Sequence, residues 1–221
     1  MMVWHDVDQN SDEWMALRVG RVGGSSIGRI MANYGKAFGQ PAQDLAVRIA
    51  LEQIIGVKSA GGFSNSHTER GHEQEPVARM LYEEWTFTDV ALGGYYAIGD
   101  DIGVSPDGLV GEDGIIEIKS VIDTVHFATI KRGSFDPSYK WQLYHNLQHT
   151  GRQWIDYVSF CPDFPEDKRL FISRIERKDC AEKFEMMDTR MAEFRRLVKE
   201  AKAIIRGTNA EVEAIVERVR S

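Results

Sequence analysis

The chain has 221 residues, of which 43% are hydrophobic and 28% are charged, and its formal net charge is −7. This composition is ordinary for a globular protein, and the length is sufficient for one large domain, which we expect to cover residues 1–221. The sequence contains no apolar run long enough to span a membrane and no recognisable signal peptide, so we expect a cytoplasmic protein without a membrane partner.

The charge is unevenly divided along the chain. Residues 1–120 carry 9 Lys and Arg against 18 Asp and Glu, whereas residues 121–221 carry 18 against 16. An acidic total argues mildly against nucleic acid as a partner, because nucleic acids usually bind basic surfaces. Bound cations would offset charge in the acidic half, so the total is compatible with a DNA enzyme that has a local basic channel.

A glycine-rich turn over residues 18–24 lies between two predicted helices near the N-terminus. The first helix ends at Leu17, and the second is expected to be capped by Ser25 or Ser26. The free N–H groups at the start of a helix bind anions, and Arg18 could donate two hydrogen bonds to a phosphate. The alternative is a plain capped helix with a surface arginine.

Apolar periodicity and the intervening turn residues predict the remaining elements. Helices are expected over residues 41–55, 66–85, 124–131, 138–150, 179–206 and 211–220, with a loop at 61–64. Strands are expected over residues 87–97 with a turn at Gly93–Gly94, and over 104–110, 115–119, 154–161 and 168–175. Lys131 and Arg132 could face DNA or could simply be solvated. A second group of basic residues could contact DNA, although a solvated face is favoured for it: Arg190, Arg195, Arg196, Lys199 and Lys202.

Charged and apolar residues alternate in the strand that ends at Lys119. Ile116 and Ile118 should point to one face, while Glu117 and Lys119 point to the other. A hairpin can bring Asp107 to the same place, so two carboxylates and an ammonium group should converge. Carboxylate oxygens are ligands that Mg²⁺ prefers, and the combination suits metal-assisted hydrolysis of a phosphodiester. The alternative is an edge hairpin with solvated charges.

Two further contributions to this site are expected. The backbone carbonyl of Ile118 lies between the two charged residues and could be another metal ligand. Lys119 could orient or deprotonate the attacking water, because a lysine near a metal ion can have a lowered pKa.

Four motifs resemble those of the PD-(D/E)xK nucleases, and more closely those of the phage lambda exonuclease group, the YqaJ-type viral recombination exonucleases. In chain order they are Glu13-Trp14-x-x-Leu17-Arg18-x-Gly20-x-x-Gly23-Gly24-Ser25, Arg70-Gly71-x-x-x-Glu75-Pro76, Ser105-Pro106-Asp107-Gly108-Leu109 with Glu117-x-Lys119, and Tyr139-x-Trp141-Gln142-x-x-x-x-Leu147-x-x-Thr150-Gly151. The resemblance covers residues 11–160. It implies an α/β fold with a central mixed β-sheet flanked by helices, which is a restriction-endonuclease-like core.

The resemblance also implies a role for each carboxylate. Asp107, Glu117, Glu75 and the carbonyl of Ile118 would hold Mg²⁺, for which Mn²⁺ could substitute, and Lys119 would serve the attacking water. Without the motif, Glu75 would be assigned to a solvated helix face.

Other motif residues would bind DNA or support the site. Arg18 and Ser25 would bind the 5′-phosphate of DNA, with Ser26 as a substitute for Ser25 because two adjacent serines leave the register open. Ser105 and Gln142 would support the active site. Tyr144 stands where the family usually has a second glutamine, a difference that puts that contact in question.

The implied activity is Mg²⁺-dependent 5′→3′ digestion of one strand of linear duplex DNA. The enzyme would release mononucleotides and leave a 3′ single-stranded overhang for phage-type recombination. The implied partners are double-stranded DNA ends, a phage single-strand annealing protein and two further copies of the chain in a ring-shaped homotrimer. A phage or prophage protein of this kind would act in the cytoplasm of a bacterial host.

Two other functions remain open. An endonuclease on the same superfamily core would differ by cutting closed circular duplex DNA. A non-catalytic module that binds DNA ends or a partner protein would have a decayed site, which the intact Asp107, Glu117 and Lys119 argue against.

Overall fold

The structure is a computed structural model, and it describes residues 1–59, 66–207 and 217–218. The expected loop at 61–64 lies outside the described residues, as does the helix expected over 211–220 apart from residues 217–218. None of the helices in the described ranges has the length and apolarity needed to cross a membrane.

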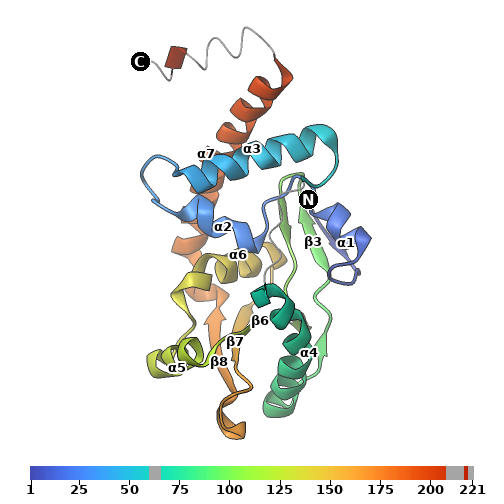
Figure 1. The fold of residues 1–221 in the computed structure, drawn as a ribbon, viewed down its shortest axis with the longest axis vertical. Helices are drawn as coiled ribbons and strands as arrows, with labels where there is room; N and C mark the ends of the chain where they lie inside the picture. The colour runs from blue at the N-terminus through green and yellow to red at the C-terminus, as the bar shows by residue number, and fades with distance from the viewer. Residues whose placement is uncertain (60–65, 208–216, 219–221) are drawn as a thin grey trace.

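Seven α-helices, eight strands and three short 3-10 helices (Pro137–Tyr139, Glu166–Lys168 and Arg177–Asp179) form the described part of the fold (Figure 1). The helices are α1 (Asp12–Leu17), α2 (Gly24–Met31), α3 (Gln40–Ile55), α4 (Ser66–Thr86), α5 (Asp123–Arg132), α6 (Lys140–Thr150) and α7 (Ala181–Arg206). The strands are β1 (Met2–His5), β2 (Val90–Ala91), β3 (Tyr95–Ile98), β4 (Ile102–Val104), β5 (Gly108–Val110), β6 (Gly114–Ser120), β7 (Trp154–Phe160) and β8 (Leu170–Glu176). The expected helices that correspond to α3 to α7 are confirmed with small shifts at their ends.

A five-stranded sheet with the order β2-β5-β6-β7-β8 forms the centre of the fold. β6 and β7 are parallel, and the other neighbours are antiparallel, so the sheet is mixed. α6 packs on one face of this sheet through Leu143 and Leu147, whereas α4 packs on the opposite face through Ala78 and Tyr82. The expected α/β fold, a central mixed sheet flanked by helices, is confirmed.

A second layer of helices covers the end of the molecule away from α5. α3 packs against α7, and both contact α2, which in turn packs against α6 (Figure 1). Their shared core is apolar and includes Ile27, Ile30, Leu45, Ile49, Met187, Met191 and Phe194. Because α2 and α6 are in contact, the N-terminal glycine-rich turn lies close to the central sheet.

A separate three-stranded sheet has the order β1-β3-β4. Strand β1 was not expected, because four residues are too few to show a clear alternation, and their partner Tyr95–Ile98 is distant in sequence. The chain enters this sheet between β2 and β3 and leaves it between β4 and β5. The two strands within 87–97 therefore belong to different sheets, and the expected strand over 104–110 is wrong because Ser105–Asp107 divides it.

The two connections between the sheets lie against each other at Gly93 and Pro106. A Cβ atom on Gly93 would lie 1.7 Å from the carbonyl oxygen of Pro106. The indole of Trp4 donates a hydrogen bond to the Gly93 carbonyl at 3.2 Å, and Gln9 donates to the Pro106 carbonyl at 3.4 Å. This close backbone contact helps to place the next residue, Asp107.

Replacing Gly93 with alanine should lower the free energy of unfolding by about 1–3 kcal/mol, because the added methyl group meets backbone that cannot rotate away. The matched control is Gly28→Ala in α2, where no atom lies within 4 Å of the new Cβ. That helical substitution should be neutral or stabilising by up to about 1 kcal/mol. Urea denaturation measures both, and equal stability of the two variants would contradict the proposed contact.

Candidate active site

Asp107 directly precedes β5 and is attached to β6 by two hydrogen bonds. Its carboxylate oxygen Oδ2 accepts from the N–H of Ile118 at 2.7 Å, and its own N–H donates to the carbonyl of Ile116 at 3.1 Å. The hairpin therefore closes as the sequence predicts. The carboxylate of Asp107 is brought beside the middle of the strand that carries Glu117 and Lys119.

Ser105 fixes the segment that leads to Asp107. Its hydroxyl donates a hydrogen bond to the Gly94 carbonyl at 2.7 Å and accepts one from the indole of Trp14 at 3.0 Å. This side chain thus links the two connections between the sheets with α1. Its position suits the supporting role expected from the sequence.

Glu117 is only 1% exposed and is held by three side chains. Its Oε1 lies 2.6 Å from the Nζ of Lys119 and accepts a second hydrogen bond from Gln142, while its Oε2 accepts from Asn146 at 2.7 Å. Gln142 and Asn146 are one turn apart on α6, and Ile116 packs on the opposite side of the sheet. The predicted alternation in this strand is confirmed.

Glu75 approaches Asp107 from α4, and Arg79 joins the two. The Nη2 group of Arg79 donates hydrogen bonds to Oε1 of Glu75 at 2.7 Å and to the backbone carbonyl of Asp107 at 2.9 Å. The side chains of Glu75 and Arg79 are each 19% exposed, so this ion pair is largely shielded from water. Glu75 is therefore not on a fully solvated helix face, which was the alternative interpretation of its place in the sequence.

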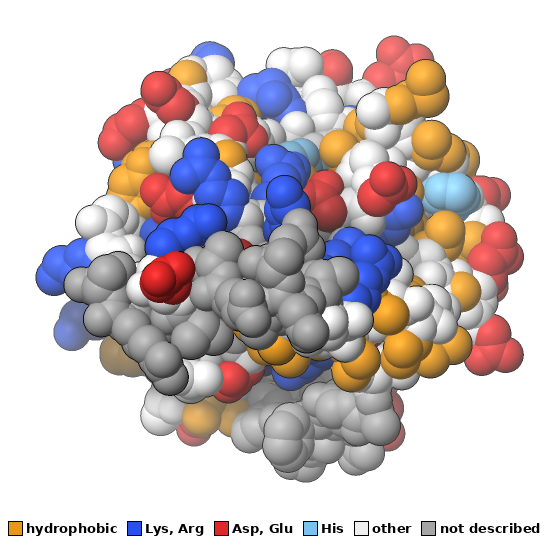
Figure 2. Space-filling model, turned by 90° about the horizontal axis from the view of Figure 1, so that it is seen from above, with side chains coloured by type: hydrophobic (Ala, Val, Ile, Leu, Met, Phe, Trp, Pro, Cys, Tyr) orange, Lys and Arg blue, Asp and Glu red, His pale blue; other side chains and the backbone are white. Residues whose placement is uncertain are grey.

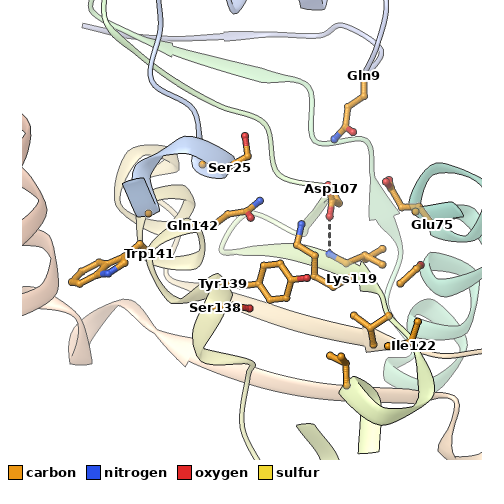
Figure 3. A pocket seen from close by; sticks show the side chains of 17 residues that line it. Gln9, Ser25, Glu75, Asp107, Lys119, Ile122, Ser138, Tyr139, Trp141 and Gln142 are labelled. Carbon is orange, nitrogen blue, oxygen red and sulfur yellow. Dashed lines mark hydrogen bonds between the residues drawn. The ribbon is translucent and has the colours of Figure 1, made fainter. Parts of the chain in front are cut away.

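A cavity of about 640 Å³, which we call the carboxylate cavity, lies in front of these residues. Figure 3 shows Lys119 and Asp107 directed into it beside each other, with Glu75 on the α4 side and Gln9 above them. The ring of Tyr139 lies on the side of Lys119 away from Glu75 and Gln9, and Lys119 Nζ is 5.2 Å from the centroid of this ring. The cavity combines a charged wall with an apolar and aromatic wall that includes Val121, Ile122, Val125, Tyr139 and Trp141.

Burial and mutual repulsion dominate the electrostatics of the carboxylates. Burial, followed by the charge of Asp107, raises the pKa of Glu75 to about 7 and that of Glu117 to about 7. Burial lowers the pKa of Lys119, but the charges of Glu117 and Asp107 outweigh it and hold that pKa above its ordinary value. The carboxylates around Lys119 therefore favour its charged form.

The donor set is suitable for a hard divalent cation. Glu75, Asp107 and Glu117 supply three carboxylates, and two cations, Lys119 and Arg79, are paired with them. Burial first, and then the charge of Asp107, raises the pKa of both glutamates. Within the described ranges, no three His, Cys, Asp or Glu side chains are already arranged as a ligand group. The residues fit Mg²⁺ or Mn²⁺ chemically, while Glu75 and Glu117 remain paired with the cations of the protein.

A second cavity, of about 430 Å³, shares Asp107 and Lys119 with the carboxylate cavity. We call it the arginine cavity, because its lining includes Arg18, Arg21, Arg29, Arg48 and Lys58. Glu117, Gln142 and both candidate serines also line it. The residues predicted to bind a phosphate and the residues predicted to cut one therefore share adjoining cavities.

The start of α2 distinguishes the two serines. Gly23, not a serine, occupies the N-cap, so the expected cap is wrong. The hydroxyl of Ser26 donates to the Gly23 carbonyl at 2.9 Å and accepts from its N–H at 3.2 Å. Ser25 is exposed and lines both cavities. The first helical residue, Gly24, packs closely on α6, because a Cβ there would lie 2.8 Å from Oδ1 of Asn146.

The basic residues of α7 do not form one DNA-facing surface. Arg190 is buried, with Nε donating to the Ile30 carbonyl at 3.0 Å, so the idea that it contacts DNA is wrong. Arg195 forms a 2.6 Å ion pair with Asp101. Figure 2 looks onto the end of the molecule that carries α3 and the C-terminal part of α7, where Lys and Arg side chains gather with Asp and Glu among them.

Two residues of the site were missed by the sequence reasoning. They are Asn146, which donates to Glu117, and Arg79, which donates to Glu75. Tyr144 packs between Phe135 and Trp141 and does not take the place of the second glutamine. The i, i+4 spacing from Gln142 was a usable signal for Asn146, because it puts both amides on one helix face. The same spacing from Glu75 could have indicated Arg79.

Comparisons with known proteins show what this chain is similar to. Residues 13–153 match the model of the YqaJ-like viral recombinase domain. The structure resembles an alkaline exonuclease (LHK-Exo) from Laribacter hongkongensis, with a TM-score of 0.74 and 32% sequence identity over 88% of this chain and 98% of that one. The structure of the same exonuclease in complex with dAMP gives a TM-score of 0.73 and 33% sequence identity, again over 88% of this chain and 98% of that one.

A more distant structure shares the fold. A phage related exonuclease from Haemophilus somnus 129PT has a TM-score of 0.65 and 16% identity, over 84% of this chain and 96% of that one. A comparison with curated proteins gave no significant match.

Proposed function

The chain belongs to the YqaJ-like viral recombinase family of phage-type recombination exonucleases, and from this premise we propose that it is a Mg²⁺-dependent 5′→3′ exonuclease of linear duplex DNA. It would degrade one strand to mononucleotides and leave a 3′ overhang for single-strand annealing. The observation that carries this proposal is the junction of the two cavities at Asp107 and Lys119. One cavity offers carboxylates for a metal ion, and the other offers cations for a terminal phosphate.

The proposed chemistry assigns a task to each side chain of the carboxylate cavity. A bound divalent metal would polarise the scissile phosphate and lower the pKa of a water molecule. Asp107, Glu117 and Glu75, with the carbonyl of Ile118, would hold it. Lys119, whose Nζ lies 2.6 Å from Glu117 and which lines the carboxylate cavity, would orient the attacking water and stabilise negative charge on the phosphate.

Gln142 and Asn146 would keep the carboxylate of Glu117 in one orientation. Each oxygen of Glu117 receives an amide hydrogen bond from α6, so its rotation is restricted. Restricting a ligand before the substrate arrives lowers the cost of forming the reactive geometry. Mononucleotide release is further supported by the related alkaline exonuclease, whose structure was solved with dAMP.

The polarity of digestion would come from Arg18. Its guanidinium lies 4.0 Å above the ring of Trp14, lines the arginine cavity and can donate two hydrogen bonds to a phosphate. Ser25 is the better candidate for the accompanying hydroxyl, because that of Ser26 is engaged with Gly23.

Replacing Arg18 with alanine should reduce the preference for 5′-phosphorylated over 5′-hydroxyl ends by about tenfold or more, since a charge-assisted hydrogen bond contributes about 1.5–3 kcal/mol. Total DNA affinity should fall much less, because the remaining backbone contacts are spread along the duplex. The measurement is the ratio of digestion rates for the two kinds of end. If the wild-type protein digests both ends equally fast, this role of Arg18 is wrong.

Linear duplex DNA labelled at either 5′ or 3′ ends, with and without Mg²⁺, tests the function itself. The proposal expects labelled mononucleotide from the 5′ end first, and only with the metal. Closed circular duplex is the comparison substrate. Cleavage of circles would favour an endonuclease, and binding of ends without any cleavage would favour a non-catalytic module.

The assembly and setting follow from the family rather than from this single chain. We expect a ring-shaped homotrimer around the duplex, working with a phage single-strand annealing protein in the cytoplasm of a bacterial host. A net charge of −7 gives one copy little electrostatic attraction to DNA, and a ring would prevent escape during processive digestion.

Light scattering should therefore report about three times the 25.1 kDa mass of one chain. A mass equal to one chain, unchanged by Mg²⁺ or by DNA, would rule out the ring. A chain that binds DNA again after each cut would then be the remaining explanation of processive digestion.

A further inference from the structure

Glu52 in α3 is a fully buried carboxylate that belongs to none of the sequence motifs. Its two oxygens accept hydrogen bonds from the Gly20 N–H at 2.9 Å, from the Ser59 N–H at 3.2 Å and from the Ser59 hydroxyl at 3.1 Å. The Nζ of Lys58 lies 3.4 Å from Oε2. Burying a carboxylate is costly without such partners, so this group is a built feature of the fold.

The contacts of Glu52 join two segments that lie far apart in sequence. One is the turn at Gly20, which follows Arg18, and the other is the segment over residues 56–59 after α3. The neighbouring Gln53 donates to the Gly20 carbonyl at 2.6 Å, so α3 holds both polar groups of this glycine. Gly20 has φ = +68°, and a Cβ there would lie 2.5 Å from Cγ of Gln53.

Both segments present a cation to the arginine cavity. Arg18 comes from the first, Lys58 comes from the second, and Arg48 of α3 adds a third. The lining of this cavity carries six Lys and Arg side chains against three carboxylates, those of Glu52, Asp107 and Glu117. Burial lowers the pKa of Arg18 and of Lys58. The charge of Glu52 raises the pKa of Lys58 in part, whereas the charges of Arg18 and Arg48 lower it further. An anion in the cavity would relieve this repulsion.

We propose that Lys58 is a second cation for the terminal phosphate of the DNA, and that Glu52 is the positioning residue that holds Lys58 and the Arg18 turn on either side of it. This inference rests on the proposed function. A terminal phosphate monoester carries up to two charges near neutral pH, whereas an internal diester carries one. Two cations held on separate segments therefore select an end over the interior of a strand.

The test compares short duplexes that differ only in a 5′-phosphate or a 5′-hydroxyl. Binding is measured with the full chain by fluorescence anisotropy in EDTA, so that no cleavage occurs, and digestion rates are measured separately with Mg²⁺. The variants are Lys58→Met, Lys58→Arg and Glu52→Gln. The last of these keeps the volume of the side chain but removes its charge. The matched control is Lys168→Met, a lysine whose side chain is 63% exposed and forms an ion pair with the exposed Asp167.

We expect Lys58→Met to reduce the binding ratio of phosphate to hydroxyl ends by about tenfold, the effect of losing one charge-assisted contact. Lys58→Arg should keep most of the ratio, and the control should keep all of it. Glu52→Gln should reduce the ratio in the same direction. Its effect should largely disappear in the Lys58→Met background, because both changes remove the same contact.

An unchanged ratio in Lys58→Met would overturn the role of the lysine. If Glu52 is purely structural, the Glu52→Gln variant should have a lower melting temperature and should bind phosphate and hydroxyl ends more weakly by the same factor. That result would overturn the positioning role of Glu52. If Glu52→Gln does not fold, the two Lys58 variants decide the phosphate contact. Failure of the wild-type chain to digest any linear duplex would contradict the proposed function alone, since the binding ratio in EDTA is measured independently.

Discussion

Lys119→Met should reduce the rate of DNA cleavage by about 10²–10³-fold while leaving the affinity for DNA ends nearly unchanged, as expected for the loss of one preorganised charge at the reacting phosphate. Lys119 Nζ lies 2.6 Å from Glu117 and projects into the carboxylate cavity, so its charge is placed where negative charge would develop. Interactions that strengthen only in the transition state affect turnover more than binding. Single-turnover digestion of a 5′-phosphorylated duplex measures the rate, and anisotropy in EDTA measures the binding.

The substitution also leaves Glu117 buried without its cation, so folding must be checked by circular dichroism before rates are compared. The control is again Lys168→Met, which removes an exposed lysine that lines neither the carboxylate cavity nor the arginine cavity. A folded Lys119→Met variant that keeps near-normal turnover would show that the site is assigned incorrectly. A variant that loses binding and turnover equally would show that Lys119 acts in substrate binding instead.

Asp107→Asn should abolish most cleavage, by about 10³-fold or more, because metal polarisation is worth several kcal/mol in the transition state. Asparagine keeps the size of the side chain and an oxygen that can accept the hydrogen bond from Ile118 N–H. The hairpin should therefore survive, and the change isolates the loss of the carboxylate charge. Calorimetric titration with Mn²⁺ should show weaker metal binding in parallel with the lost activity.

Asp113→Asn provides a matched control in the same hairpin. Asp113 is exposed in the turn between β5 and β6, where its backbone carbonyl accepts hydrogen bonds from the N–H groups of Gln153 and Trp154. That variant should bind Mn²⁺ and cleave DNA like the wild type. Normal Mn²⁺ binding by Asp107→Asn would remove Asp107 from the ligand set, and normal cleavage would remove it from the active site.

The helices could be predicted well because their ends and faces are encoded locally. α3, α5, α6 and α7 are each followed by a glycine with positive φ, namely Gly56, Gly133, Gly151 and Gly207. The apolar stripe of α7 is buried as expected at Met187, Met191 and Phe194. A helix of this length carries several turns of the same pattern, so a single exception does not hide it.

That single exception, Arg190, shows the limit of the pattern. It lies on the buried face of α7, where its guanidinium is 3.6 Å from the ring of Phe38 and bonds to the Ile30 carbonyl. Nothing in the sequence near Arg190 indicates these partners. The same holds for Glu52, whose burial depends on the Gly20 turn and on the segment after α3.

By itself, the sequence determined the chemistry of β6 and the face on which it is displayed. Side-chain direction alternates along any strand, so the order Ile116-Glu117-Ile118-Lys119 places both charges together wherever the strand lies. Only the tertiary structure decided what those charges meet. Asp107 reaches β6 because the chain leaves one sheet at Ser105 and enters another, and Arg79, Asn146 and the arginine cavity arrive from other helices. Such encounters depend on the packing of distant segments against one another, and periodicity within a single segment carries no information about them.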